Sequence, residues 1–120
     1  MDSPFVHLEL STKDVNKAKE FYGSLFEWKL EDMPMGNGAT YTTIKTGKDP
    51  GGGMMAAMPG SPVAWMPYVL VEDVAKSTKK AKDLAATIVK DKTDIPNMGA
   101  FSVIVDPTGA TIGLFQNIAK

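Results

Sequence analysis

The chain lacks cysteine, holds a single histidine, and contains no long apolar run. Without cysteine there is no disulfide, no thiolate metal site and no cysteine nucleophile, and the composition fits a reducing compartment. No apolar stretch approaches the ~20 residues of a membrane-spanning helix. The N-terminal segment MDSPFVHLEL also lacks the basic stretch and apolar run of a signal peptide. We therefore expect a cytoplasmic protein with no membrane partner.

Excess charge of either sign is also absent, because 13 basic and 14 acidic side chains leave a formal net charge of -1. Lysines gather in segments 13–19 and 76–92, mixed with acids and threonines. This mixture predicts solvated helix faces, with a phosphate-binding surface as the alternative. The sequence has no basic patch, so we expect no nucleic acid partner. The length of 120 residues and the 43% hydrophobic content predict one globular domain.

The segment FVHLELSTKDVNKAKEFY reads as a strand that runs directly into a helix. Along the strand Phe5–Ser11, alternation places two sets of side chains on opposite faces, and the apolar set is expected to pack against the helix. Asp14 is the predicted N-cap of that helix, and Gly23 is expected to help end it. The two strand faces are His7, Glu9 and Ser11 on one side, and Val6, Leu8 and Leu10 on the other.

Further strand-like pieces follow, namely EWKLEDM, ATYTTIK and MMAAM, with turns predicted at PMGNG and GKDPGGG. The same order then recurs. The pair Asp73-Val74 stands 59 residues after Asp14-Val15, and AFSVI matches TYTTI at an offset of 60. The second helix is expected to present one apolar face, made of Val74, Thr78, Ala81, Leu84 and Ala85.

Internal repetition of this kind predicts the architecture. We expect an α+β fold of two tandem β-α-β-β-β modules that form curved mixed sheets around a shared cavity. The whole chain, 1–120, would be one domain, with module one at about 4–58, a Pro/Gly/Ser linker at about 59–64 and module two at about 65–118. A chance similarity of two ordinary α+β halves is the alternative.

Three segments resemble one known family: HLELSTKDVNKAKEFYGSLFEW, VEDVAKSTKKAKDLAA and the C-terminal VIVDPTGATIGLFQ. The chain is similar to the vicinal oxygen chelate superfamily, the group of glyoxalase I, bleomycin-resistance proteins and extradiol dioxygenases. The likeness covers essentially the whole chain. It implies paired β-α-β-β-β modules and often a homodimer.

The resemblance also implies where a metal would bind. Metal-using members take a His or Gln from the first strand of each module and a Glu from the last strand of each. The matching positions in this chain are His7, Gly53, Met66 and Gly113. Glycine has no side-chain donor, and a thioether is a poor ligand for Zn, Ni, Mg or Mn. We therefore expect no metal and no cofactor, with a weak site at His7 and Glu9 as the alternative.

The predicted cavity wall is apolar and aromatic with a few polar groups, as ligand pockets usually are. Gly53 and Gly113 are expected to leave room where metal ligands would project. A closed, fully packed core is the alternative. The expected ligand-binding side chains are His7, Tyr41, Thr43, Met55, Met66, Tyr68, Phe101 and Phe115.

Three functions are compatible with this pattern. The first is a metal-free protein that binds a small organic molecule, of the glyoxalase/bleomycin-resistance type. The second is a glyoxalase-like lyase, isomerase or dioxygenase in which His7 and Glu9 are catalytic, with or without a divalent metal. The third is a purely structural or interaction domain. A homodimer is expected because open sheet edges need cover, with Met33, Met35, Met58 and Trp65 as candidate contact residues.

Overall fold

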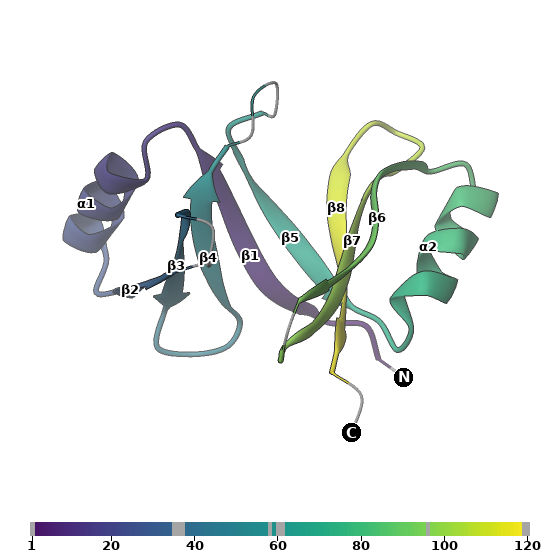
Figure 1. The fold of residues 1–120 in the computed structure, drawn as a ribbon, viewed down its shortest axis with the longest axis horizontal. Helices are drawn as coiled ribbons and strands as arrows, with labels where there is room; N and C mark the ends of the chain where they lie inside the picture. Colours follow the sequence, from purple (N-terminus) through teal and green to yellow (C-terminus); the bar gives the residue numbers. More distant parts are fainter. Residues whose placement is uncertain (1, 35–37, 58, 60–61, 96, 119–120) are drawn as a thin grey trace. The chain divides into compact units, whose positions relative to one another are not determined.

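A computed structural model of the chain describes residues 2–34, 38–57, 59, 62–95 and 97–118. It contains eight strands and two helices, in the order β-α-β-β-β written twice (Figure 1). The predicted α+β fold of two such modules is confirmed. The chain divides into two compact units, which we call the N-terminal unit (Val6–Met66) and the C-terminal unit (Pro67–Lys120 with Met1–Phe5). The predicted module boundaries and the shared cavity stay predictions.

The N-terminal unit has a mixed four-stranded sheet in the order β2-β3-β4-β1. Strand β1 runs parallel to β4, and the other neighbours are antiparallel. Helix α1 lies beside this sheet in Figure 1. The elements are β1 (Phe5–Thr12), α1 (Val15–Leu25), β2 (Lys29–Pro34), β3 (Thr40–Lys45) and β4 (Gly51–Ala56).

The C-terminal unit repeats the arrangement, with strands in the order β5-β8-β7-β6. Strand β5 runs parallel to β8, and the other neighbours are antiparallel. Helix α2 contacts β6, β7 and β8. The elements are β5 (Ala64–Leu70), α2 (Val74–Asp83), β6 (Thr87–Ile95), β7 (Gly99–Val105) and β8 (Thr111–Asn117).

Strand register shows that the two halves are the same unit. Glu9 lies opposite Gly53 in the first parallel pair, and Tyr68 lies opposite Gly113 in the second. These residues are 59 and 60 positions apart, the offsets at which the sequence repeats. The glycine of each last strand therefore has the same place in both units.

Both helices begin at an aspartate that caps them. The side chain of Asp14 accepts a hydrogen bond from Lys17 N at 3.0 Å, and Asp73 accepts one from Lys76 N at 3.1 Å. The predicted N-cap at Asp14 is confirmed. The expected stop at Gly23 is wrong, because α1 continues to Leu25. Within the part of the chain that the structure describes, no helix is long and apolar enough to cross a membrane.

The core of the N-terminal unit lies between the sheet and α1. Leu10, Ile44 and Met54 are buried and form one cluster. Alternation along β1 placed Leu10 on the helix side, opposite His7 and Glu9, and the cluster agrees with that assignment. The half-buried side chains packed against it come from α1 and β2 or the segment between them: Val15, Ala18, Tyr22, Trp28 and Leu30.

The structure describes the two predicted turns only in part. The segment GKDPGGG is a turn in its first half, and its last three glycines belong to β4. A Cβ at Gly52 would overlap the backbone oxygen of Leu8, so the close approach of β1 requires glycine there. For PMGNG, the positions 35–37 lie outside the described residues.

The expected apolar face of α2 is correct within the helix and wrong beyond it. Val74 and Thr78 are buried and Ala81 is half-buried, but Leu84 is 65% exposed. The helix ends at Asp83, and the N–H of Leu84 bonds back to Ala81 O and Lys80 O, which tightens the last turn. Ala85 then has φ of 76°. The end of the predicted face therefore lies beyond the helix.

The Asp-Pro-x-Gly segment forms the turn between β7 and β8. One oxygen of Asp106 accepts hydrogen bonds from Thr108 Oγ1 at 2.7 Å, Thr108 N at 2.8 Å and Ala110 N at 3.1 Å. The Thr108 hydroxyl, followed by the two backbone N–H groups, holds the pKa of Asp106 below its usual value. Gly109 completes the turn with φ of 100°, a conformation that favours glycine.

Asp32 joins α1 to the sheet. Its carboxylate accepts hydrogen bonds from Lys19 Nζ on α1 at 2.6 Å and from Thr42 Oγ1 on β3 at 2.7 Å. Lys19 first, and then Thr42, lowers the pKa of Asp32 from its usual value of 3.8. Thr42 is fully buried, and Asp32 satisfies its hydroxyl.

The effect of Asp32 on stability should depend on pH. Because its pKa is lowered on folding, its contribution is present above pH 3.8 and is lost as pH falls through the lower folded value. The difference in unfolding free energy between wild type and Asp32→Asn should be constant near neutral pH and shrink below about pH 4. Urea titrations across pH 2–7 measure it, with Asp83→Asn as the control for removing an exposed carboxylate. An Asp32→Asn difference that is flat down to pH 2 would contradict the prediction.

Candidate functional site

Three polar side chains meet on the sheet face opposite α1 in the N-terminal unit. Tyr41 Oη lies 2.6 Å from Glu9 Oε1 and 2.9 Å from His7 Nε2. His7 Nε2 also lies 3.2 Å from Glu9 Oε1. The side chains of His7 and Glu9 are 32% and 18% exposed, so the group is neither buried nor freely solvated. We call it the His7–Glu9–Tyr41 cluster.

The direction of these hydrogen bonds follows from the number of hydrogens that each group can donate. Tyr41 has one O–H, and Glu9 accepts it. The contact between Tyr41 Oη and His7 therefore needs an N–H on His7 Nε2, which the Nε2–H tautomer and the imidazolium both supply. The one hydrogen on His7 Nε2 is then shared between Tyr41 Oη at 2.9 Å and Glu9 Oε1 at 3.2 Å, so Oε1 accepts from the Tyr41 hydroxyl and shares the His7 N–H.

The other oxygen of that carboxylate is the polar atom that remains available. Among the described residues, both hydrogen bonds of Glu9 use Oε1 and none uses Oε2. No buried side-chain oxygen or nitrogen in the described part of the chain lacks a partner, so Oε2 is not sealed inside the unit. Glu9 can therefore accept a further hydrogen bond from an N–H or O–H group.

Gly53 is the reason that Tyr41 can reach this position. A Cβ at Gly53 would overlap the hydroxyl and the ring of Tyr41. The expectation that this glycine leaves open room is wrong, because the phenol of Tyr41 fills the space.

The C-terminal unit has a matching arrangement without the polar cluster. The ring of Tyr68 covers Gly113, where a Cβ would overlap it. Tyr68 is 7% exposed, and its ring meets Phe101 edge to face with centroids 6.2 Å apart. The room expected at Gly113 is likewise filled. Tyr68 has the place of Glu9, and Phe101 that of Tyr41.

The remaining predicted ligand-binding residues lie on β3, β4, β5 and β8. Thr43 is opposite Gly53 on β3, and its hydroxyl donates to Glu31 O at 3.2 Å. Met55 on β4 and Met66 on β5 are half-buried. Phe115 is half-buried opposite Phe101 in the β7–β8 pair. Thr43 and Phe115 therefore lie opposite Gly53 and Phe101, and the role of all four residues as ligand contacts stays a prediction.

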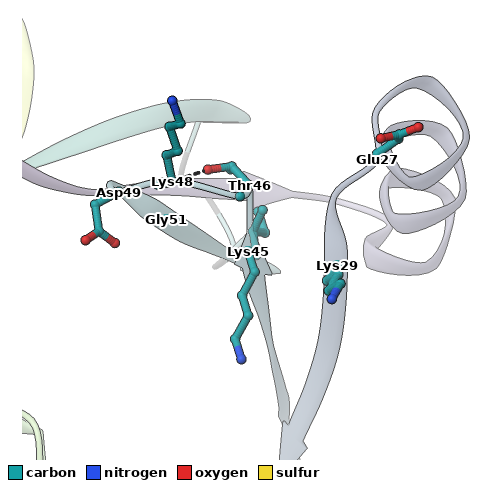
Figure 2. A pocket seen from close by; sticks show the side chains of 9 residues that line it. Glu27, Lys29, Lys45, Thr46, Lys48, Asp49 and Gly51 are labelled. Atoms are coloured by element: carbon teal, nitrogen blue, oxygen red, sulfur yellow. Dashed lines mark hydrogen bonds between the residues drawn. The ribbon is translucent and has the colours of Figure 1, made fainter.

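A hollow in the N-terminal unit lies away from the cluster, at the loop between β3 and β4. It measures about 510 Å³ and includes three lysines, Lys29, Lys45 and Lys48. Figure 2 shows that Lys45 and Lys48 point in opposite directions. No group of charges converges on one point there, so the hollow carries no candidate chemistry.

Comparison with known proteins now identifies the family. Residues 5–114 match the model of the Glyoxalase/Bleomycin resistance protein/Dioxygenase superfamily. The chain belongs to this superfamily. The resemblance found in the sequence is therefore confirmed.

Curated relatives from the superfamily are longer than this chain. A protein of Mycobacterium tuberculosis named "Putative glyoxylase CFP32" is 34% identical over 114 residues, which cover 91% of this chain and 44% of that protein. The "Anthracycline biosynthesis protein DnrV" of Streptomyces peucetius is 22% identical over 127 residues, 90% of this chain and 45% of that protein. The chain thus spans less than half the length of these relatives.

Solved structures share the fold at low sequence identity. The hypothetical protein BH1468 of Bacillus halodurans superposes with a TM-score of 0.74 at 12% identity, covering 100% of this chain and 98% of that one. The methylmalonyl-CoA epimerase of Mycobacterium tuberculosis superposes with a TM-score of 0.69 at 14% identity, covering 96% and 88%. At these identities the likeness shows the fold alone.

The metal that the superfamily implies does not fit the residues present. Of the four matching positions, Gly53 and Gly113 offer no donor atom, and Met66 offers a soft thioether. A donor side chain at position 53 would also collide with Tyr41. Among the described residues, no group of three or more His, Asp and Glu side chains could hold an ion together.

Sequence reasoning missed how Tyr41 contributes. The sequence placed Tyr41 with His7 among the side chains of the predicted cavity wall, but nothing in the pattern indicated that its hydroxyl would join His7 and Glu9. The available signal was the glycine in β4. A glycine opposite a strand residue often marks close approach by another group, and here that group is the phenol of Tyr41.

The packing over Gly113 makes a stability prediction. Gly113→Ala should cost about 1–3 kcal/mol, because its methyl group overlaps the buried ring of Tyr68. The matched control is Gly23→Ala, whose Cβ would lie 3.7 Å from Leu30 Cδ1, an ordinary contact. That change should be neutral or stabilise α1 by up to about 1 kcal/mol. Urea unfolding compares the two, and equal effects would contradict the account of Gly113.

Proposed function

We propose that this chain binds a small organic molecule without a metal, through the His7–Glu9–Tyr41 cluster. The observation that carries the proposal is Glu9 Oε2, which takes no hydrogen bond within the described residues although Oε1 takes two. An acceptor held in this way selects a ligand that presents an N–H or O–H group. The carboxylate disfavours an anionic group at the same place, because like charges repel.

The apolar part of the ligand would contact half-buried apolar side chains of the N-terminal unit, among which Met55 and Met66 are adaptable. The C-terminal unit has a separate aromatic surface made of Tyr68, Phe101 and Phe115. The fold can hold an organic ligand, since solved structures that share it include a methylmalonyl-CoA epimerase in complex with methylmalonyl-CoA.

A second function is supported by the hydrogen-bonded series itself. His7 Nε2, Tyr41 Oη and Glu9 Oε1 form a continuous path along which a proton can move. Such a group could catalyse metal-free isomerase or lyase chemistry, with Glu9 as base and Tyr41 or His7 as acid. Binding and catalysis would use the same cluster, so the Glu9→Gln variant would impair both and does not distinguish them. Turnover of a bound ligand would favour the enzyme.

A homodimer is part of the proposal. Met33 and Trp65 are 48% and 37% exposed, and Trp65 Nε1 donates to Tyr22 OH at 3.2 Å, which fixes the indole at the end of α1. Large exposed apolar side chains of this kind suit a protein contact. The other two candidates, Met35 and Met58, lie outside the described residues.

Matched pairs of small aromatics test the ligand class. Phenol against anisole, and benzamidine against benzoate, compare a hydrogen-bond donor with a non-donor and a cation with an anion. The donor or cation of each pair should raise the melting temperature of wild type more, and Glu9→Gln should weaken its binding about tenfold, or about 1.4 kcal/mol. Glu31→Gln, an exposed carboxylate on β2, is the control. Preference for benzoate, or unchanged affinity in Glu9→Gln, would overturn the proposal.

A further inference from the structure

Gly53 lies at the centre of the face that carries the cluster. It is opposite Glu9 on β1 and opposite Thr43 on β3, and it is buried. The atoms nearest to a Cβ built at Gly53 are Tyr41 Oη, Cζ and Cε2. No backbone atom is among these three nearest atoms, so the overlap is with the outer end of one side chain.

This geometry makes two arrangements mutually exclusive. Either residue 53 has a side chain, or the Tyr41 hydroxyl lies between Glu9 Oε1 and His7 Nε2. Gly53 does not need glycine for its backbone, since it is not among the glycines with positive φ. The requirement for glycine therefore comes from Tyr41.

We propose that Gly53 is a positioning and specificity-determining residue, whose missing side chain lets Tyr41 donate to Glu9 and so leaves Glu9 Oε2 for the ligand. A chain with any larger residue at this position would lose the phenol from the cluster. His7 and Glu9 would then be left to bind some other group. The benefit to the ligand rests on the function proposed above, whereas the packing of Tyr41 over Gly53 is tested without any ligand.

The first test is a double-mutant cycle of Gly53→Ala and Tyr41→Ala, measured by urea unfolding. Gly53→Ala should lower the unfolding midpoint in wild type, because the new methyl group displaces the phenol. In the Tyr41→Ala background, its cost should fall to about half or less, since the side chain that it overlaps is gone. Additive effects would overturn the proposal.

The cycle also gives a result if one of the variants does not fold. If Gly53→Ala does not fold but the double variant does, Tyr41 is the cause and the proposal stands. If Tyr41→Ala folds and the double variant does not, the requirement for glycine has another origin and the proposal fails.

The second test follows the cluster directly, because the chain has one histidine and therefore one set of imidazole NMR signals. Gly53→Ala should move the His7 ring signals in the same direction as Tyr41→Phe, since both remove Tyr41 Oη from His7 Nε2. Gly23→Ala, in α1, should leave them in place. Unmoved His7 signals in a folded Gly53→Ala protein would overturn the proposal.

The two proposals can fail separately. In one outcome, the mutant cycle and the His7 signals behave as expected, but Glu9→Gln binds every ligand as tightly as wild type. Gly53 then positions Tyr41, and the proposed contact between Glu9 and the ligand is wrong. If Gly53→Ala instead weakens phenol binding as strongly as Glu9→Gln does, both proposals stand. If it leaves phenol binding intact, the specificity role of Gly53 fails.

Discussion

The structure depends on the close approach of one tyrosine to a glycine in each unit. In the N-terminal unit the phenol of Tyr41 covers Gly53, and in the C-terminal unit the ring of Tyr68 covers Gly113. The parallel pairing of the first and last strands fixes both glycines at the same register. Substituting either one forces a tyrosine to move, and in the N-terminal unit that tyrosine also holds the polar cluster together.

Much of the fold could be predicted from the sequence, because repetition and alternation are local signals. The offset of about 60 residues gave the two modules, and the alternation of β1 separated Leu10 from His7. The end of α2 and the start of β4 were predicted wrongly. The end of α2 is set by a tightened last turn and the left-handed Ala85, and the start of β4 by a contact distant in the sequence, the approach of β1 to Gly52.

The residues of the candidate site could be predicted from the sequence, but the contacts between their side chains could not. The sequence placed His7 and Tyr41 in one predicted cavity wall, and at the four metal-ligand positions that the resemblance implies it has a suitable donor at His7 alone. It did not indicate that a phenol fills the space at position 53, since that depends on the reach of a β3 side chain over the neighbouring strand β4. Members of one fold support different chemistry through such changes at a site.

The central claim is that His7, the one side chain suited to a divalent metal among the four matching positions, takes part in a hydrogen-bonded cluster and does not hold a metal. Purified wild type can be saturated with Zn²⁺, Ni²⁺, Co²⁺ or Mn²⁺, desalted and analysed for metal by mass spectrometry, beside His7→Ala. The account predicts that wild type retains far less than one equivalent per chain, and no more than His7→Ala. One equivalent of metal retained by wild type and lost in His7→Ala would contradict it.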